Sequence, residues 1–385
     1  MQRMIDFYNE QSTAFSEAIK ENSKLEIEDF IDTNPAKISW TRALRRDANN
    51  SIQHKFKENE FNNGLYRPFT KQWLYFDKPF IESPGLNSML FPNEKSKNIV
   101  INITGIGASK PFSVLISDKI SSIDCIEKNQ CFPLYYYEEN KTHQANLFDI
   151  SPFGGEGAYI RRDAISDFIL ERAKKQYGMT RGLNPLLKEN IFYYVYGFLH
   201  SPKYRETFAS DLKKMLPRLP LVDDVRDFWA FSKAGRALAD LHLNYENISA
   251  HPDVRETQSD PFEHGQSINN EILYNHYYVT QMRFPAKDQK DKIIYNSHIY
   301  IENIPAEAYG YIVNGKSAIE WIMERYAVAT HKESGITNNP NDWARENRNP
   351  RYIIDLLHSV INLSVQTVGI VKNLPDVEFG SEEDE

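Results

Sequence analysis

Three apolar segments lie close together between residues 98 and 137, and each has the length and composition of a β-strand. Residues 99–103 (IVINI) form an uninterrupted β-prone run, and residues 112–117 and 131–137 have the same character. Strands this close in sequence predict a sheet. Because helical patterns occupy both flanks, we expect a mixed α+β fold with N-terminal helices, a central mixed sheet, and helical middle and C-terminal segments.

The helical patterns are apolar residues that recur at spacings of three and four. One or two short helices are expected within residues 4–31, ending at the DTNP sequence of residues 32–35. A Ser-Pro pair at residues 201–202 has the cap and first-position proline typical of a helix start. Further helices are expected at residues 165–177, 191–199, 225–241, 317–326 and 350–371, and a hairpin at residues 293–304.

The chain has 385 residues, of which 41% are hydrophobic, so it can bury a large core in two or three domain-sized units. No apolar run reaches the roughly 18 residues that span a bilayer, and the N-terminal sequence lacks the apolar core of a signal peptide. We therefore expect a cytoplasmic protein with no membrane partner. Cys125 and Cys131 stand without further cysteines or paired histidines nearby, so they are expected to be reduced packing residues, with no metal site.

The formal net charge of −8 argues against indiscriminate coating of nucleic acid. Six of the negative charges lie in the last ten residues, 376–385, which we expect to be a disordered acidic tail. The remaining body is close to neutral and can still carry a basic face. A basic segment at residues 37–57 is either a solvated helix face or a surface that follows phosphates.

Residues 65–77 (LYRPFTKQWLYFD) contain the densest mixture of aromatic and basic side chains in the chain. This mixture suits stacking on bases or pairing with phosphate. The alternative is a half-buried strand pair in which Arg67 and Lys71 extend past the aromatic rings into water.

A second ambiguous segment, residues 104–111 (TGIGASKP), has glycines that would let backbone amides approach an anion beside Lys110, although a plain turn also accounts for it.

Residues 310–317 (GYIVNGKS) match the phosphate-loop pattern of nucleotide-binding proteins. Three features weaken this interpretation. No buried strand leads directly into the match, its interior residues are bulky and β-prone, and the nearest acidic magnesium-binding candidate, at residues 221–224, precedes it. Nucleotide hydrolysis through Lys316 and Ser317 therefore remains only as the rival hypothesis.

Other catalytic patterns do not assemble. The Asn-Pro pairs of the chain lack the second proline and aromatic residue with which adenine methyltransferases hold a flipped base. Acid-x-lysine triplets at residues 211–213 and 288–290 follow no convincing strand with a partner acid, as a metal nuclease would require. His200 and His242 lie on apolar helical segments and are expected to be core histidines, not bases or ligands.

Several segments together resemble the C-terminal target-recognition region of type ISP restriction-modification enzymes and related single-chain restriction-methyltransferase proteins. They are residues 65–77, 104–120, 130–135 (QCFPLY), 194–202 (YVYGFLHSP), 228–229, 239–245 (ADLHLNY), 314–321 (NGKSAIEW) and 339–343 (NPNDW). In that family a nuclease, a helicase-like ATPase and an adenine N6-methyltransferase precede the recognition region. The resemblance implies that the chain itself is non-catalytic and needs no cofactor, whereas S-adenosylmethionine, ATP and Mg²⁺ serve the full-length enzyme. It also implies that residues 313–321 belong to the recognition region and not to an ATPase.

The resemblance implies a module that binds double-stranded DNA beside upstream methyltransferase, ATPase and nuclease domains. We expect residues 1–85 to connect to the methyltransferase, residues 86–250 to form an α/β recognition core, and residues 251–375 to form a second α/β part. The scaffold or phosphate-facing candidates are Arg67, Lys71, Ser109, Lys110 and Lys119. The base-reading candidates, chosen because Arg, Asn and Gln make bidentate base contacts, are Arg161, Arg162, Arg181, Asn184, Asn269, Asn270 and Gln281. A third hypothesis is an adaptor that docks other subunits without touching DNA.

Overall fold

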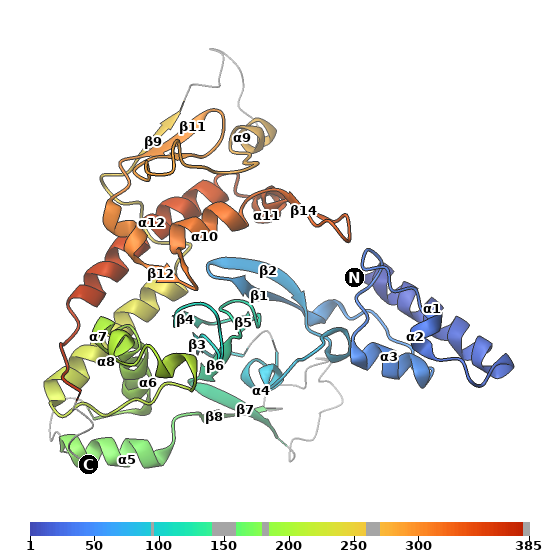
Figure 1. The fold of residues 1–385 in the computed structure, drawn as a ribbon, viewed down its shortest axis with the longest axis horizontal. Coiled ribbons are helices and arrows are strands. Elements are labelled where there is room, and N and C mark those ends of the chain that lie inside the picture. Colours follow the sequence, from blue (N-terminus) through green and yellow to red (C-terminus); the bar gives the residue numbers. More distant parts are fainter. Residues whose placement is uncertain (94–95, 141–158, 179–184, 259–269, 380–385) are drawn as a thin grey trace, which may run out of the picture. The chain divides into compact units, whose positions relative to one another are not determined.

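The structure is a computed structural model that describes residues 1–93, 96–140, 159–178, 185–258 and 270–379 (Figure 1). The chain divides into two compact units. Unit 1 comprises Met1–Gly64, Gln72–Ser88 and Val328–Asn339, and unit 2 comprises Leu65–Lys71, Met89–Ala327 and Pro340–Glu385. The three-part division expected from the sequence stays a prediction.

Unit 1 is mainly helical. Its elements are α1 (Gln2–Glu21), α2 (Ile27–Phe30), α3 (Arg42–Asn49), the 3-10 turns η1 (Glu58–Glu60) and η2 (Lys78–Phe80), and the short hairpin of β14 (Ala329–Thr330) and β15 (Thr337–Asn338). Tyr8 and Phe15 of α1 pack with Leu44 of α3 in one hydrophobic cluster. Helix formation within residues 4–31, expected as one or two short helices, is confirmed: α1 extends over 20 residues and is longer than expected, and α2 is a single short turn.

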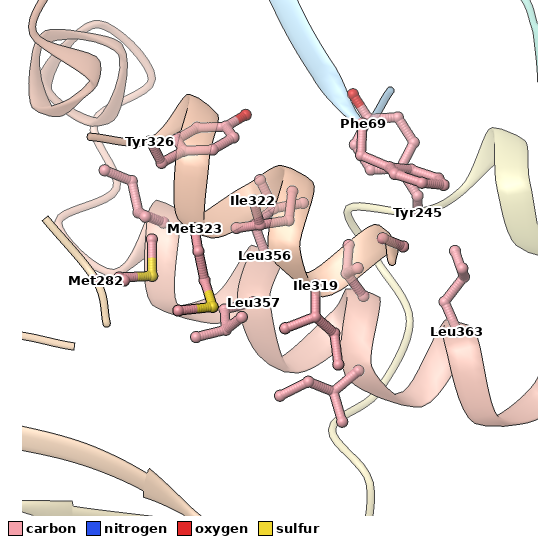
Figure 2. Packing of buried hydrophobic residues seen from close by; sticks show 14 of the residues in the cluster. Phe69, Tyr245, Met282, Ile319, Ile322, Met323, Tyr326, Leu356, Leu357 and Leu363 are labelled. Carbon is pink, nitrogen blue, oxygen red and sulfur yellow. The ribbon is translucent and has the colours of Figure 1, made fainter. Parts of the chain in front are cut away.

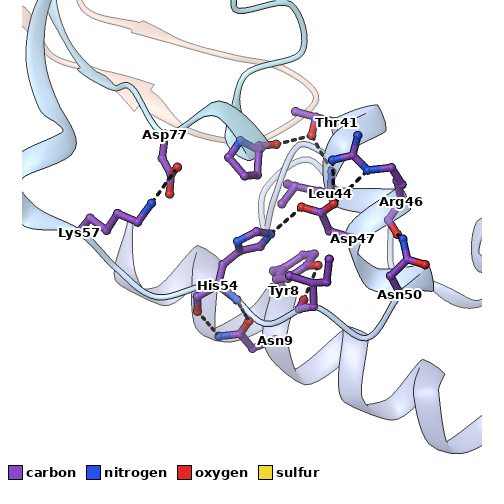
Figure 3. A network of polar contacts seen from close by, with 12 residues as sticks. Tyr8, Asn9, Thr41, Leu44, Arg46, Asp47, Asn50, His54, Lys57 and Asp77 are labelled. Carbon is purple, nitrogen blue, oxygen red and sulfur yellow. Dashed lines mark hydrogen bonds and ion pairs between the residues drawn. The ribbon is translucent and has the colours of Figure 1, made fainter. Parts of the chain in front are cut away.

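A polar network fixes the loop that follows α3 against α1 (Figure 3). The side chain of Asn9 brackets His54, donating to its carbonyl at 2.8 Å and accepting from its backbone amide at 2.9 Å. The His54 ring lies 3.1 Å from the carboxylate of Asp47, which is only 7% exposed. Thr41 caps α3 by accepting a hydrogen bond from the Leu44 amide at 3.0 Å. Through these contacts, Thr41, Asp47 and His54 of the segment at residues 37–57 are hydrogen-bonded within unit 1.

The sheet predicted from the apolar segments forms in unit 2. Its central strand is β3 (Val100–Ile103), with β4 (Val114–Ser117) and β6 (Gln130–Pro133) antiparallel on either side. Ile101 lies opposite Ile116 and Phe132. β3 and β4 are buried throughout, which explains why their sequences are continuous apolar runs without alternation.

Helices α6 (Lys188–Phe198) and α8 (Val225–Leu243) share a hydrophobic cluster with this sheet. Their backbones approach closely at a pair of glycines. A Cβ on Gly235 would lie 1.9 Å from the Tyr193 carbonyl oxygen, and one on Gly197 would lie 2.2 Å from the Phe231 carbonyl oxygen. Only glycine fits at either position, so this glycine pair sets the helix–helix distance.

A second core of unit 2 is organised around α12 (Tyr352–Lys372), which packs against α10 (Ala318–Arg325) (Figure 2). Ile319 and Ile322 of α10 are buried in the same cluster as Leu356 and Leu357 of α12. By length and composition α12 could cross a membrane, but its apolar side chains are buried in this core. It is therefore the central helix of a globular unit.

The other elements of unit 2 are short. They are β5 (Ile120–Ser121), β7 (Tyr135–Glu139), β8 (Tyr159–Asp163), α5 (Asp167–Tyr177), α7 (Pro202–Thr207), η3 (Asp211–Lys213), β9 (Arg255–Gln258), α9 (Asn270–His276), β10 (Ile293–Ile294), β11 (Ile299–Glu302), η4 (Ala306–Gly310), β12 (Ile312–Val313), β13 (Lys316–Ser317) and α11 (Pro340–Glu346), with α4 (Asn87–Leu90) at the division between the units. The mixed α+β class is confirmed. The strands are divided among several small sheets instead of one central sheet.

The aromatic-basic stretch forms the hairpin of β1 (Phe61–Arg67) and β2 (Thr70–Tyr75), and β1 also pairs with β5. At its tip Phe69 has a φ of 56° and is buried, with its ring edge-on to Tyr245 and Tyr311. Burial of a phenylalanine at the turn, where solvent-exposed residues are usual, ties the hairpin tip into unit 2. The predicted strand pair is therefore confirmed, and the tip aromatic is a packing residue.

Candidate nucleic-acid interface

The glycine-containing loop of residues 104–111 connects β3 to β4 and does hold an anion. The backbone amides of Ser109 and Lys110 donate to the Glu127 carboxylate at 2.9 and 2.8 Å, and the Ser109 hydroxyl donates to it at 3.0 Å. These hydrogen bonds lower the pKa of Glu127. Of the two interpretations open from the sequence, an amide cradle and a plain turn, the loop forms the cradle, and the chain's own carboxylate occupies it.

This arrangement leaves the Lys110 side chain beside the turn at residues 314–316. A Cβ on Gly315 would lie 3.2 Å from Cδ of Lys110. Partial burial, together with the nearby cations Arg325 and Lys110, lowers the pKa of Lys316. Two lysines far apart in the sequence therefore come together near the surface, which is an arrangement suited to a phosphate.

The phosphate-loop pattern of residues 310–317 forms a β-hairpin and a helix cap. Asn314 and Gly315 have φ values of 51° and 83° and form the two-residue turn between β12 and β13. Ser317 caps α10, accepting from the Glu320 amide at 3.2 Å, and Lys316 pairs with Glu324. Each residue of the pattern that a nucleotide would need has a structural role here.

Three of the predicted phosphate-facing cations are held by partners within unit 2. Arg67 donates to the Tyr66 carbonyl at 2.9 Å and stacks on the Tyr66 ring. Lys71 pairs with Glu246, and Lys119 pairs with Asp118 at 3.0 Å. The side chains of Arg67 and Lys71 are only 18% and 19% exposed. The strand-pair alternative placed these two side chains past the aromatic rings in water; instead acidic and aromatic partners hold them against the surface.

Arg161 and Arg162 lie on the two-stranded ribbon of β7 and β8, opposite Tyr137 and Tyr136. Both are exposed, but Arg161 lies over the Tyr135 ring at 4.3 Å, and Arg162 donates to Glu138 at 3.1 Å. A two-stranded antiparallel ribbon has dimensions that fit the DNA major groove. The ribbon therefore presents arginine and tyrosine side chains on an element of suitable shape.

Asn270 is exposed at the first position of α9, and Gln281 is exposed beyond the end of that helix. Gln281 lines a polar groove that also contains Arg283, a residue that our sequence reasoning missed. The signal was present as alternation, because Met282 is buried between the exposed Gln281 and Arg283. Arg181, Asn184 and Asn269 lie outside the residues that the structure describes.

The two histidines are confirmed as core residues. Burial lowers the pKa of His242 to about 3, and its ring accepts or donates hydrogen bonds to Tyr196 at 2.6 Å and Thr367 at 3.0 Å. His200 is 3% exposed, and burial lowers its pKa as well. Cys125 is also buried, and both cysteines are free thiols. Neither histidine is placed or charged to act on a ligand at neutral pH.

These features define an α+β domain in which several candidate DNA-facing lysines and arginines lie on loops and on a hairpin ribbon, with Asn270 at the start of α9. The chain belongs to the family described as the Type ISP C-terminal specificity domain, whose model matches residues 1–356. No curated protein sequence is significantly similar to the chain.

Solved structures provide further similarity. A nuclease-deletion mutant of the Type ISP restriction-modification enzyme LlaGI, in complex with a DNA substrate mimic, is 34% identical with a TM-score of 0.77, over 99% of this chain and 31% of that chain. The ATP-dependent Type ISP enzyme LlaBIII bound to DNA is 31% identical with a TM-score of 0.79, over 99% and 22%. A DrdV–DNA complex is 29% identical with a TM-score of 0.76, over 98% and 33%. The chain therefore spans a third or less of the length of these proteins.

Proposed function

We propose that the chain recognises a specific sequence in double-stranded DNA and positions the duplex for reactions carried out by other domains of a restriction-modification enzyme. The observation that carries this proposal is the match of the specificity-domain family to residues 1–356. The solved relatives, which align with nearly the whole chain, are described as DNA complexes. The proposal is supported further by the lysines near residues 110 and 316 and by the exposed arginines on the ribbon of β7 and β8, which suit phosphates and the major groove respectively.

In this proposal the other domains are an adenine N6-methyltransferase, a helicase-like ATPase and a nuclease. S-adenosylmethionine, ATP and Mg²⁺ would serve those domains, and this chain would bind none of them. The support is the small share, 22–33%, of each related enzyme that the chain matches. A cytoplasmic location, where the DNA to be modified is found, follows from this role.

The chain's own residues would act in two ways. Lys110 would contact phosphates, and Lys316 would do so once DNA competes with its contact to Glu324. Phosphate contacts would set the position of the duplex, since they orient a protein without carrying sequence information. Arg161 and Arg162 could enter the major groove on the ribbon of β7 and β8, once DNA competes with their contacts to Tyr135 and Glu138. Specificity would come from side chains that meet base edges.

The test is selection of bound duplexes from a randomised DNA pool, followed by affinity measurements on the enriched sequence at several salt concentrations. We expect one sequence to be enriched and its affinity to fall as salt rises, because phosphate contacts release counterions. Failure to enrich any sequence would favour the adaptor hypothesis. Micromolar binding of labelled ATP that is lost in Lys316→Ala would instead favour nucleotide hydrolysis.

A further inference from the structure

A polar groove of about 520 Å³ lies in unit 2 between the segment that follows α9 and the β10–β11 hairpin. In Figure 1 these elements lie together in the orange part of the ribbon. The side chains that line the groove and can offer hydrogen bonds include Asn275, Thr280, Gln281, Arg283 and His298. Among the described residues that line it, none is acidic, so the groove carries the positive charge of Arg283 without a compensating carboxylate in its wall.

The backbone under these side chains is held firmly on one side by Asn341. This buried amide accepts from the Val279 backbone amide at 3.0 Å and donates to the Val279 carbonyl at 2.9 Å. Arg283 exchanges two backbone hydrogen bonds with Ile294, of 3.1 and 2.8 Å. Val279 and Met282 are buried in the core of unit 2. The exposed positions between and beside these anchors are therefore presented from a fixed backbone.

The opposite wall is fixed by Asn296. Its side-chain amide donates to the carbonyls of His276 and Tyr278 at 2.9 and 3.1 Å, and its oxygen accepts from the backbone amides of His298 and Ile299 at 2.9 Å each. All hydrogen-bonding capacity of this amide is thus used to join the end of α9 to the hairpin. Asn296 shapes the groove and is not itself available to a ligand.

Gln281 and Arg283 differ from Asn296 in this respect. Within the described part of the chain, neither side chain makes a hydrogen bond or an ion pair, and both are exposed. Two exposed hydrogen-bonding groups on fixed backbone, one an amide and the other a guanidinium, match the chemistry that reads base edges. Arginine pairs with two acceptors of guanine, and glutamine pairs with the donor and acceptor of adenine.

We propose that this groove is a base-reading site in which Gln281 and Arg283 contact base edges of double-stranded DNA and determine part of the target sequence. The inference rests on the proposed DNA-recognition function and assigns its specificity to named residues. Lys71 and Arg162 have partners to give up before they bind DNA, whereas Gln281 and Arg283 have none among the described residues. These two side chains can therefore contact DNA without breaking an existing interaction.

The experiment is duplex selection from a randomised pool with the chain and with four variants. Arg283→Ala and Gln281→Ala should each lose discrimination at one base position by about 10- to 100-fold, leaving the other positions unchanged. Arg283→Lys keeps the charge but loses the planar fork, so it should lose the same discrimination. Lys287→Ala, which removes a nearby exposed lysine outside the groove, is the control and should keep the full preference.

The outcomes separate this inference from the function on which it rests. A chain that enriches a sequence, with groove variants that enrich the same sequence, overturns the base-reading site and leaves DNA recognition intact. If Arg283→Ala weakens binding to all sequences equally and Arg283→Lys restores the affinity in full, Arg283 is a phosphate contact. That result also overturns the base-reading site. Failure of the unmodified chain to enrich any sequence overturns both. Circular dichroism of each variant checks that the fold is retained.

Discussion

Glu256 joins strand β9 to the start of helix α12, and its removal should destabilise unit 2. Arg351 donates to both of its carboxylate oxygens, at 3.0 and 2.8 Å, and the His358 ring lies 3.3 Å from one of them. The Glu256 side chain is 14% exposed. Burial opposes its ionisation, but hydrogen bonds from His358 and Arg351 outweigh burial and lower its pKa from 4.5 to about 2.

This pKa difference sets the size of the effect. Each pKa unit is worth about 1.4 kcal/mol, so ionised Glu256 favours the folded state by about 3 kcal/mol at neutral pH. Arg351 remains partly exposed and keeps Asp355 at 3.1 Å, which limits the cost of losing its main partner. We therefore expect Glu256→Gln to lower the free energy of unfolding by about 2–3 kcal/mol at pH 7.

The same linkage gives the pH dependence and its sign. The folded-state pKa is depressed, so the stabilisation is complete above pH 4.5 and is lost as the pH falls toward 2. By pH 3 the difference between the unmodified chain and Glu256→Gln should shrink to about half or less of its value at pH 7.

The assay is unfolding in urea, monitored by hydrogen–deuterium exchange of peptides from α12. A local probe is needed because the chain has two units, and a global signal would combine the unfolding of both. Glu171→Gln, which removes an exposed partner of Lys174, is the matched control and should have little effect. The reasoning would be refuted if Glu256→Gln lost no more free energy of unfolding than this control, or if its loss of free energy of unfolding were equal at pH 7 and pH 3.

Three further predictions follow from individual contacts. Gly235→Ala should lower the free energy of unfolding by about 1–3 kcal/mol in urea titrations, because the new Cβ meets the Tyr193 carbonyl oxygen; unchanged stability would contradict the close approach. Glu127→Ala should speed amide hydrogen exchange at residues 109–110, because this carboxylate accepts hydrogen bonds from both backbone amides. In the unmodified chain, the protection of these amides should be lost only when acid protonates Glu127, whose pKa is lowered. Exchange rates at residues 109–110 that do not depend on Glu127 would show that the loop is ordered without this carboxylate. Lys71→Ala should cost about 1 kcal/mol of stability yet change DNA affinity less than about twofold, because Glu246 already pairs with this lysine; a uniform large loss of affinity would make it a phosphate contact.

Much of the fold could be predicted from residue patterns. The apolar runs at β3 and β4 and the helical spacing of α6, α8 and α12 appear in the structure near the expected bounds. What pattern analysis did not give is how the strands are grouped, since the pairing of β1 with β5, for example, depends on tertiary packing. Phe69 is a second example: its segment allowed either stacking on bases or a half-buried strand pair, and the fold shows that its ring is buried against Tyr245.

For the candidate site, residue patterns indicated which types of side chain could contact DNA better than they indicated what each residue does in the fold. The glycines of residues 104–111 allowed either an anion-binding loop or a plain turn. Nothing local indicated that Glu127 would bind there, because the two segments meet only in the folded chain. The match at residues 310–317 was rightly discounted, and the turn at Asn314 and Gly315 gives the physical reason. Arg283 is an arginine two residues from Gln281, so residue type alone did not distinguish it; the alternation of exposed Gln281, buried Met282 and exposed Arg283 places both side chains on one face.

The pairing of cations within the chain bears on how affinity and specificity are divided. Arg67, Lys71 and Lys119 each have an acidic or aromatic partner, and the chain carries a formal net charge of −8. These three candidate cations are thus held by partners within the chain, so the salt dependence of DNA binding should correspond to phosphate contacts made by other lysines and arginines. We therefore expect this chain to contribute mainly discrimination, because base-edge contacts carry sequence information and phosphate contacts do not. In the proposed enzyme the phosphate-binding affinity would then come mainly from the neighbouring domains, and the groove at Gln281 and Arg283 would select among the sequences that they hold.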